Sequence, residues 1–112
     1  MTRQQQINTN DLVQYHYDVA LYEYEQLSRS NRNWKKLRHC SAEVCETENY
    51  YSLRSYNTIV AVVNKYNFNV YDILRKVYGY TATSAQHLAK FAHDYGNLVM
   101  YRWREVPNDV ES

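Results

Sequence analysis

The most constraining feature of this sequence is one clearly amphipathic helical segment set between runs of β-forming residues. Its apolar side chains recur at the spacing i, i+3, i+4 and i+7, as Leu88, Phe91, Ala92 and Tyr95. Residues rich in Val, Ile, Tyr and Thr precede it at 50–53, 58–63 and 70–78, and a further such run follows at 98–106. This order predicts a small antiparallel sheet with a β-β-α-β core over residues 50–106.

Local signals mark the ends of these predicted elements. Residues 64–69 form a polar turn, so the strands on either side are expected to make a hairpin with a longer loop. Thr83 and Gln86 have the spacing of a capping box, and Gly96 stands where a helix commonly ends. Along 98–106 the side chains alternate between two faces, with Val99, Tyr101 and Trp103 on one and Arg102 and Arg104 on the other.

Residues 11–31 are predicted to form an additional N-terminal helix that runs into a polar, basic connection at 28–33. Its apolar residues follow the 3.6-residue period only roughly: Leu12, Tyr15, Val19, Tyr22 and Leu27. A strand is the alternative, because Val13, Tyr15, Tyr17, Val19 and Leu21 alternate. Length and the Glu and Gln content favour the helix. The apolar residues within 34–48 follow neither the helical period nor the alternation of a strand, so the secondary structure of this segment stays open.

The length of 112 residues is that of one domain, and 45% apolar residues suffice for a core. We expect a flexible N-terminus at 1–10, a single α+β domain at 11–106 and a flexible tail at 107–112. The longest apolar run, residues 59–63, is far shorter than the roughly 20 residues of a membrane span. Residues 1–10 resemble no export signal. The expected location is therefore the cytoplasm.

Cations and tyrosines point to a contact surface. The chain has thirteen tyrosines and two phenylalanines, and so many phenols cannot all be buried in so small a domain. Five cations and no acid lie between Arg29 and Arg38, which suits phosphate or an acidic protein. The residues that we expect to bind a partner combine these two features: Tyr15, Tyr22, Arg32, Trp34, Lys35, Lys36, Arg38, Arg102, Trp103 and Arg104.

Nucleophilic catalysis finds little support in the residue pattern. Ser84 and His87 lie on adjacent turns of one predicted helix, and Asp94 lies two turns further on. No Gly-x-Ser-x-Gly turn surrounds Ser84. His87 and His93 are expected on the solvent edge of the helix, and Asp72 on the polar side of its strand. We therefore predict that the chain is not an enzyme.

Metal and cofactor sites are also not expected. Cys40 and Cys45, with His39 beside the first, lack the second pair of ligands that a zinc site needs. Two free thiols are the expectation for a cytosolic chain. With only Gly79 and Gly96, a glycine-rich phosphate loop is excluded.

Two motifs resemble a known family. They are LRSYNTIVAV at residues 53–62 and YGYTATSAQHLAKF at residues 78–91. They are similar to the SYxTxVA strand and the YxxTTSxxHxxKF helix start of small proteins carried by phages, plasmids and integrated elements of Firmicutes. The likeness covers about residues 50–96 and leaves out a variable N-terminal part at 11–48. No catalytic residues come with the family.

The resemblance implies a mobile-element accessory protein in a bacterial host. Proteins of this size and context are often inhibitors, and anti-CRISPR proteins are the best-known example. We therefore predict a non-enzymatic phage or plasmid protein, of the anti-CRISPR kind, that binds a host CRISPR effector nuclease and blocks its activity. One alternative is a small nucleic-acid-binding regulator that uses the basic residues 29–38. Another is a self-associating domain whose exposed tyrosines form a homodimer.

Overall fold

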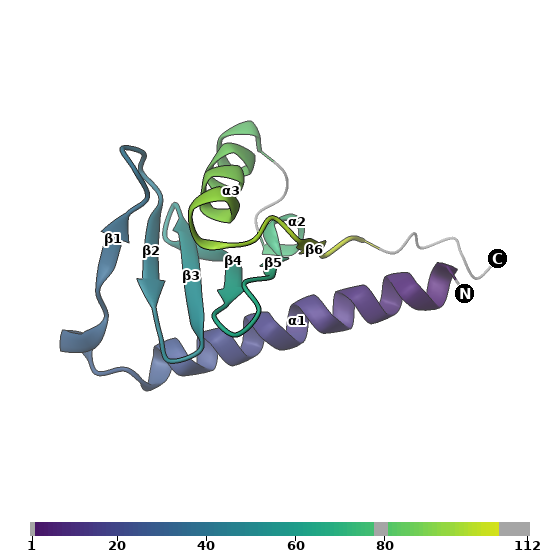
Figure 1. Ribbon diagram of the computed structural model, residues 1–112, viewed down its shortest axis with the longest axis horizontal. Helices are drawn as coiled ribbons and strands as arrows, with labels where there is room; N and C mark the ends of the chain where they lie inside the picture. Colours follow the sequence, from purple (N-terminus) through teal and green to yellow (C-terminus); the bar gives the residue numbers. More distant parts are fainter. Residues whose placement is uncertain (1, 78–80, 106–112) are drawn as a thin grey trace.

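The protein is an α+β domain in which a six-stranded sheet lies between two helices, as predicted for the fold class (Figure 1). The structure, a computed structural model, describes residues 2–77 and 81–105, with side chains from residue 9 onward. In chain order the elements are α1 (Thr2–Gln26), the 3-10 helix η1 (Arg29–Asn31), β1 (Trp34–Lys36), β2 (Glu43–Glu46), β3 (Tyr50–Ser55), β4 (Thr58–Asn64), β5 (Val70–Asp72), α2 (Leu74–Val77), α3 (Ala82–Tyr95) and β6 (Met100–Arg102).

The strands lie in the sheet in the same order as in the sequence, from β1 at one edge to β6 at the other. Neighbours from β1 to β5 are antiparallel, whereas β5 and β6 are parallel. The parallel pair arises because α2 and α3 carry the chain back over the sheet between these two strands. The predicted small antiparallel sheet is therefore mostly antiparallel, with one parallel pair at its last strand.

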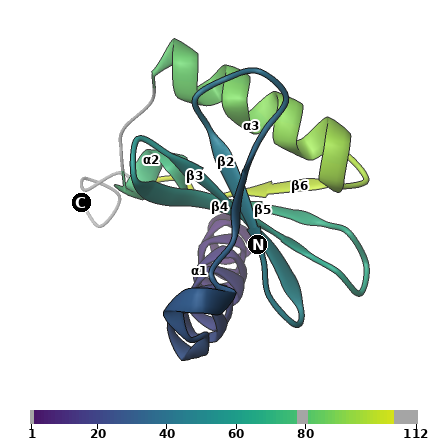
Figure 2. The ribbon, with the colours of Figure 1, turned by 90° about the vertical axis from the view of Figure 1, so that its left-hand side faces the viewer.

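The two helices cover opposite faces of the sheet, so its middle is buried on both sides (Figure 2). This explains the unbroken apolar run Ile59–Val63 of β4, whose residues are all buried. The core between sheet and α1 includes Val13, Ala20, Tyr50, Val62 and Tyr71. The core between sheet and α3 includes Leu53, Ala61, Val63, Leu88 and Phe91.

The N-terminal helix exists, but its limits differ from those predicted. α1 begins at Thr2, so residues 2–10, expected to be flexible, belong to it. The Asn10 amide accepts from the backbone N–H of Arg104 at 2.8 Å and donates to its carbonyl at 2.6 Å. This contact between distant residues attaches the helix to the chain beyond β6. Within residues 2–77 and 81–105, no helix is long and apolar enough to span a membrane.

Residues 34–48, left open by the sequence, contain the hairpin β1–β2, which widens the sheet at one edge. The turn that follows β2 is attached to α1 through Glu23. The carboxylate of Glu23 accepts from the Thr47 hydroxyl at 2.7 Å and from the Asn49 backbone N–H at 3.0 Å. Burial acts to raise the pKa of Glu23, and these hydrogen bonds outweigh it, so the pKa lies below its ordinary value.

The predicted strand 70–78 is wrong beyond Asp72. The Asp72 carboxylate accepts from the Leu74 backbone N–H at 2.8 Å, and the chain turns there into the short helix α2. Asp72 is also buried, at 6% exposed, although we expected it on a polar face. The predicted end of this strand at Tyr78 lies outside the described residues.

The predicted start of α3, a capping box at Thr83, is wrong by two residues. The N-cap of α3 is Thr81, whose hydroxyl accepts from the Ser84 backbone N–H at 3.1 Å. Gly96 ends the helix as predicted, but its φ of −109° is open to any residue. Crowding requires the glycine instead, because a Cβ at Gly96 would lie 2.6 Å from Cγ2 of the buried Val70.

β6 spans only residues 100–102 of the predicted 98–106. It starts late because Leu98 takes a left-handed φ of 70°, which a strand does not accommodate. The predicted alternation is confirmed for Tyr101 and Trp103, which pack on the α1 side of the core, whereas Val99 is exposed. Residues 106–112, which include the predicted tail, lie outside the described residues.

Candidate partner-binding surface

Two loops far apart in the sequence lie side by side at one side of the sheet, the β4–β5 loop at 65–69 and the α3–β6 loop at 96–99 (Figure 2). Asn97 joins them. Its side-chain amide donates to the Asn67 carbonyl at 2.8 Å and to the Asn69 side chain at 3.1 Å, and its backbone N–H donates to the Phe68 carbonyl at 2.9 Å. The two loops therefore form one hydrogen-bonded unit.

Each loop holds a bulky residue in the left-handed backbone region. Phe68 has φ 62° and Leu98 has φ 70°. Such a conformation costs an ordinary L-residue about 1–2 kcal/mol, so the surrounding hydrogen bonds must hold it in place. The side chains of Asn64 and Asn97 supply part of this support, since each accepts from a backbone N–H two residues further on, at 2.8 Å and 2.9 Å.

The side chains at the tips of these loops are apolar and exposed. We call them the twin-loop tip; their exposed fractions are 95% for Tyr66, 45% for Phe68, 62% for Leu98 and 46% for Val99. Isolated apolar residues at a surface are ordinary, but a group of four on adjoining, internally hydrogen-bonded loops is typical of an interaction site.

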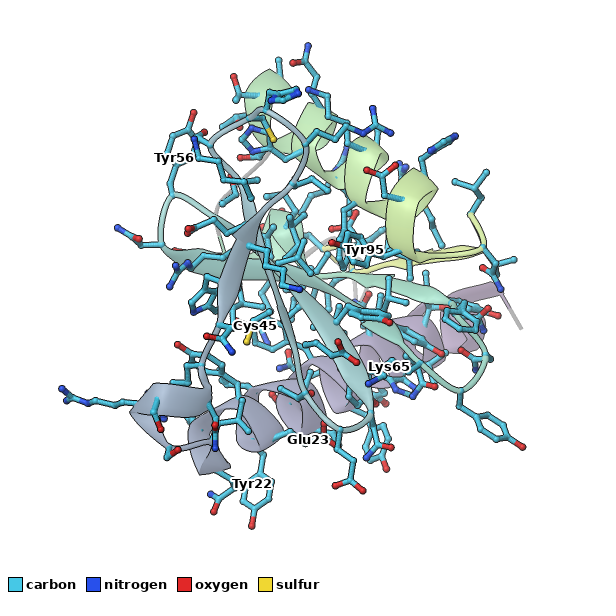
Figure 3. The ribbon with its side chains drawn as sticks, turned by 60° about the vertical axis from the view of Figure 1, so that its left-hand side comes forward. Tyr22, Glu23, Cys45, Tyr56, Lys65 and Tyr95 are labelled. Atoms are coloured by element: carbon cyan, nitrogen blue, oxygen red, sulfur yellow. The ribbon has the colours of Figure 1, made fainter. Side chains whose placement is uncertain are left out.

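The twin-loop tip carries no free cation. Lys65 is the one charged residue across 64–69 and 96–99. Its ammonium group lies 2.5 Å from the Glu46 carboxylate and donates to the Thr47 carbonyl at 3.0 Å, and Figure 3 shows it beside the body of the domain. Nucleic-acid affinity depends on cations that meet phosphates, and the cation nearest to this surface is paired with Glu46.

The sequence predicted a different surface, and the structure does not bring its ten residues onto one face. Trp34, Lys35 and Lys36 belong to β1, at one edge of the sheet, whereas Arg102 belongs to β6 at the opposite edge. Trp103 and Arg104 follow directly after β6. The order of strands therefore separates the predicted residues of β1 from those at the end of β6.

Two of the five cations between residues 29 and 38 serve the fold. The Arg32 guanidinium donates to the carbonyls of Leu27 and Glu25, both at 3.1 Å, at the end of α1. Arg38 makes a two-pronged ion pair with Asp94, at 2.8 and 2.7 Å. These hydrogen bonds from Arg38 are the main cause that lowers the pKa of Asp94 to about 2. Arg29, Lys35 and Lys36 stay exposed.

The aromatic residues predicted to bind a partner differ in their exposure to solvent. Tyr15 and Tyr22 are exposed on α1, at 61% and 62%, and Figure 3 shows Tyr22 pointing away from the domain. Trp34 is half-buried beside Tyr24, to whose hydroxyl its indole N–H donates at 3.2 Å. Arg54 lies over the Trp34 ring, 3.9 Å from its centre, and this stack borders a groove of about 300 Å³. Trp34 is thus mainly a packing residue.

Ser84 and His87, weighed above as catalytic candidates, are buried in the core rather than exposed. His87 is 4% exposed, so its predicted place on the solvent edge is wrong, whereas His93 is exposed as expected. The Ser55 hydroxyl bridges them, 3.1 Å from Nδ1 of His87 and 3.4 Å from the hydroxyl of Ser84. Burial lowers the pKa of His87, with a smaller effect from Lys90. These contacts satisfy three buried polar groups beneath the β3–β4 turn.

Metal-binding geometry is not found within residues 2–77 and 81–105, where no three or more His, Cys, Asp or Glu side chains gather around one point. Cys40 and Cys45 are free thiols. Comparisons with protein-family models, with curated proteins and with solved structures gave no match to this chain.

Sequence reasoning missed all four residues of the twin-loop tip. One signal was present, since Tyr66 and Phe68 alternate with asparagines in a segment that was interpreted only as a polar turn. A turn needs asparagine for its backbone shape, but it does not need aromatic side chains. The contribution of Leu98 and Val99 had no local signal, because their closeness to the turn depends on the tertiary fold.

Proposed function

We propose that this chain acts by binding a partner protein through the twin-loop tip, without catalysing a reaction. The observation that carries the proposal is the pair of left-handed, exposed residues Phe68 and Leu98 on two loops joined through Asn97. Strained and preorganised apolar side chains lose little conformational freedom on binding, which is how contact hot spots gain affinity. The neutral charge of the tip favours protein over nucleic acid.

The class of partner comes from the resemblance of the two sequence motifs to mobile-element proteins. On that ground we propose an inhibitor that occupies a surface of a host protein, with a CRISPR effector nuclease as the first partner to test. A stoichiometric inhibitor needs a stable, shaped surface and no reactive group, and the tip is such a surface. The cytoplasm of the bacterial host is the corresponding location.

The test compares two surfaces of the same protein. The purified chain is mixed with a purified, guide-loaded CRISPR effector nuclease, and complex formation is followed by gel filtration and biolayer interferometry. The double variant Phe68→Ser/Leu98→Asn should weaken binding by about 30-fold or more, the effect of losing a hot spot worth about 2 kcal/mol. The matched control Tyr15→Ser/Tyr22→Ser removes two equally exposed aromatic side chains from α1 and should bind as the native chain does.

Each outcome separates one part of the proposal from another. No complex with any effector, together with undiminished DNA cleavage, would contradict the proposed partner. A complex lost in the α1 control but kept in the tip variant would contradict the proposed surface. Binding to DNA or RNA that falls steeply with salt would support the nucleic-acid alternative instead, because counterion release makes such binding salt-dependent.

A further inference from the structure

The sheet contains one parallel pair among the described strands, and a crevice lies where that pair ends. Asp72 and Arg102 are the last residues of β5 and β6 and stand opposite each other in register. The crevice measures about 250 Å³ and lies between these two residues and the first turns of α3. In open α/β sheets, ligands commonly bind beside the carboxyl ends of parallel strands, and this crevice lies at the corresponding end of the β5–β6 pair.

Asp72 places a buried carboxylate in the lining of this crevice. Its side chain is 8% exposed. Oδ1 accepts from the Leu74 N–H, whereas Oδ2 lies 3.7 Å from Nε of Arg102, an ion pair beyond hydrogen-bonding distance. Burial raises the pKa of Asp72 above its ordinary value, while the Leu74 N–H and nearby cations act against that rise. One carboxylate oxygen is thus available to a donor in the crevice.

The rest of the lining supplies positive charge and an apolar wall. Arg102 is half exposed at the mouth, and Arg75 of α2 also borders the space. Leu88 and Met100 contribute apolar surface, together with two alanines of α3. A matching ligand therefore carries an anionic group for a guanidinium, a hydrogen-bond donor for Asp72 close to it, and a small apolar group.

We propose that this crevice binds a small aliphatic α-amino acid. The ammonium group would donate to Oδ2 of Asp72, the carboxylate would accept from Arg102, and the aliphatic side chain would lie on Leu88 and Met100. The volume of about 250 Å³ lies below the roughly 300–1,000 Å³ of pockets for drug-sized ligands, which fits a molecule of this size. This site is separate from the twin-loop tip and does not depend on the proposed function.

Calorimetric titration of the full chain with L-leucine tests the proposal. Saturable binding with a Kd of about 1 mM or tighter is expected, within the range for so small a ligand. Two partial ligands serve as probes: 4-methylpentanoate lacks the amino group, and 3-methylbutylamine lacks the carboxylate. Each should bind at least about 10-fold more weakly than leucine, because each loses one charged contact.

Variants identify the site. Asp72→Asn keeps a side-chain oxygen for the Leu74 N–H, so α2 keeps its cap while the charge is lost. Arg102→Ala removes the cation, and Arg104→Ala is its matched control two residues further on. Leucine affinity should fall about 10-fold or more in the first two variants and stay unchanged in the control. Absence of saturable binding to the native chain, or equal affinity in all variants, would overturn the proposal.

Discussion

Replacing Leu98 by asparagine should leave the free energy of unfolding unchanged or raise it slightly, although it removes a large apolar side chain. Leu98 has φ 70°, which costs an L-residue about 1–2 kcal/mol, and asparagine adopts this conformation much more readily. Leu98 is 62% exposed, so the burial that is lost is somewhat over a third of the 1.5–3 kcal/mol of a fully buried leucine, or about 0.5–1 kcal/mol. The balance is a gain of about 0–1 kcal/mol.

Urea denaturation followed by tryptophan fluorescence measures this difference, since Trp34 and Trp103 both pack against the core on the α1 side. Leu53→Ala is the control for a true core leucine. Leu53 is 0% exposed, and its truncation should cost about 2–5 kcal/mol. A loss of more than about 2 kcal/mol in Leu98→Asn would refute the reasoning, because Leu98 would then stabilise the fold as a core residue does.

The same variant should bind the partner protein more weakly, so stability and binding would change in opposite directions. Surface residues that serve only the fold do not behave in this way, whereas functional residues held in strained conformations do. Loss of binding without loss of stability would thus indicate that the left-handed backbone of the tip serves partner binding.

Three further predictions follow from single contacts. The pKa of Asp94, about 2 in the native chain, should return toward its ordinary 3.8 in Arg38→Ala, and an unchanged carboxylate titration by NMR would contradict the ion pair. Gly96→Ala should lower the free energy of unfolding by about 1–3 kcal/mol, because the new Cβ would lie 2.6 Å from Val70 Cγ2; an unchanged urea midpoint would show that the loops adjust freely. Burial lowers the pKa of His16 from its ordinary 6.5, so the folded chain binds fewer protons than the unfolded one. The stability that this residue contributes should decline as the pH falls below 6.5, and His16→Phe should show a smaller decline in urea titrations at pH 7.5 and about pH 5.5.

Much of the architecture could be predicted from local pattern. The helical stripe of α3, the strands β3 and β4 and the long β4–β5 loop were all predicted near their observed places. The end of α3 at Gly96 was predicted from the common use of glycine at helix ends, whereas the structure requires a glycine there because the backbone closely approaches Val70. Such a contact cannot be seen in sequence, because Val70 and Gly96 are distant along the chain.

The short elements were harder to predict. β1 and β2 have three and four residues, too few for alternation to stand out. They are strands because β2 pairs with the edge of β3 and β1 in turn pairs with β2. Similarly, β5 stops at Asp72 because the Asp72 side chain accepts from the Leu74 backbone N–H and so starts α2. Residue propensities do not show whether the chain continues as a strand or turns into a helix at such a point.

The sequence by itself determined the parts of this protein that depend on neighbours within a few residues: helix faces, turns, and the alternation of Tyr101 and Trp103. Tertiary structure alone decided which surface is available. It put Trp34, Lys35 and Lys36 on one edge of the sheet and Arg102 on the opposite edge, and it buried His87. It also joined Phe68 to Leu98 through an asparagine 30 residues from its partner. The physical reason is that exposure and proximity follow from strand order and helix packing, which depend on contacts between distant residues.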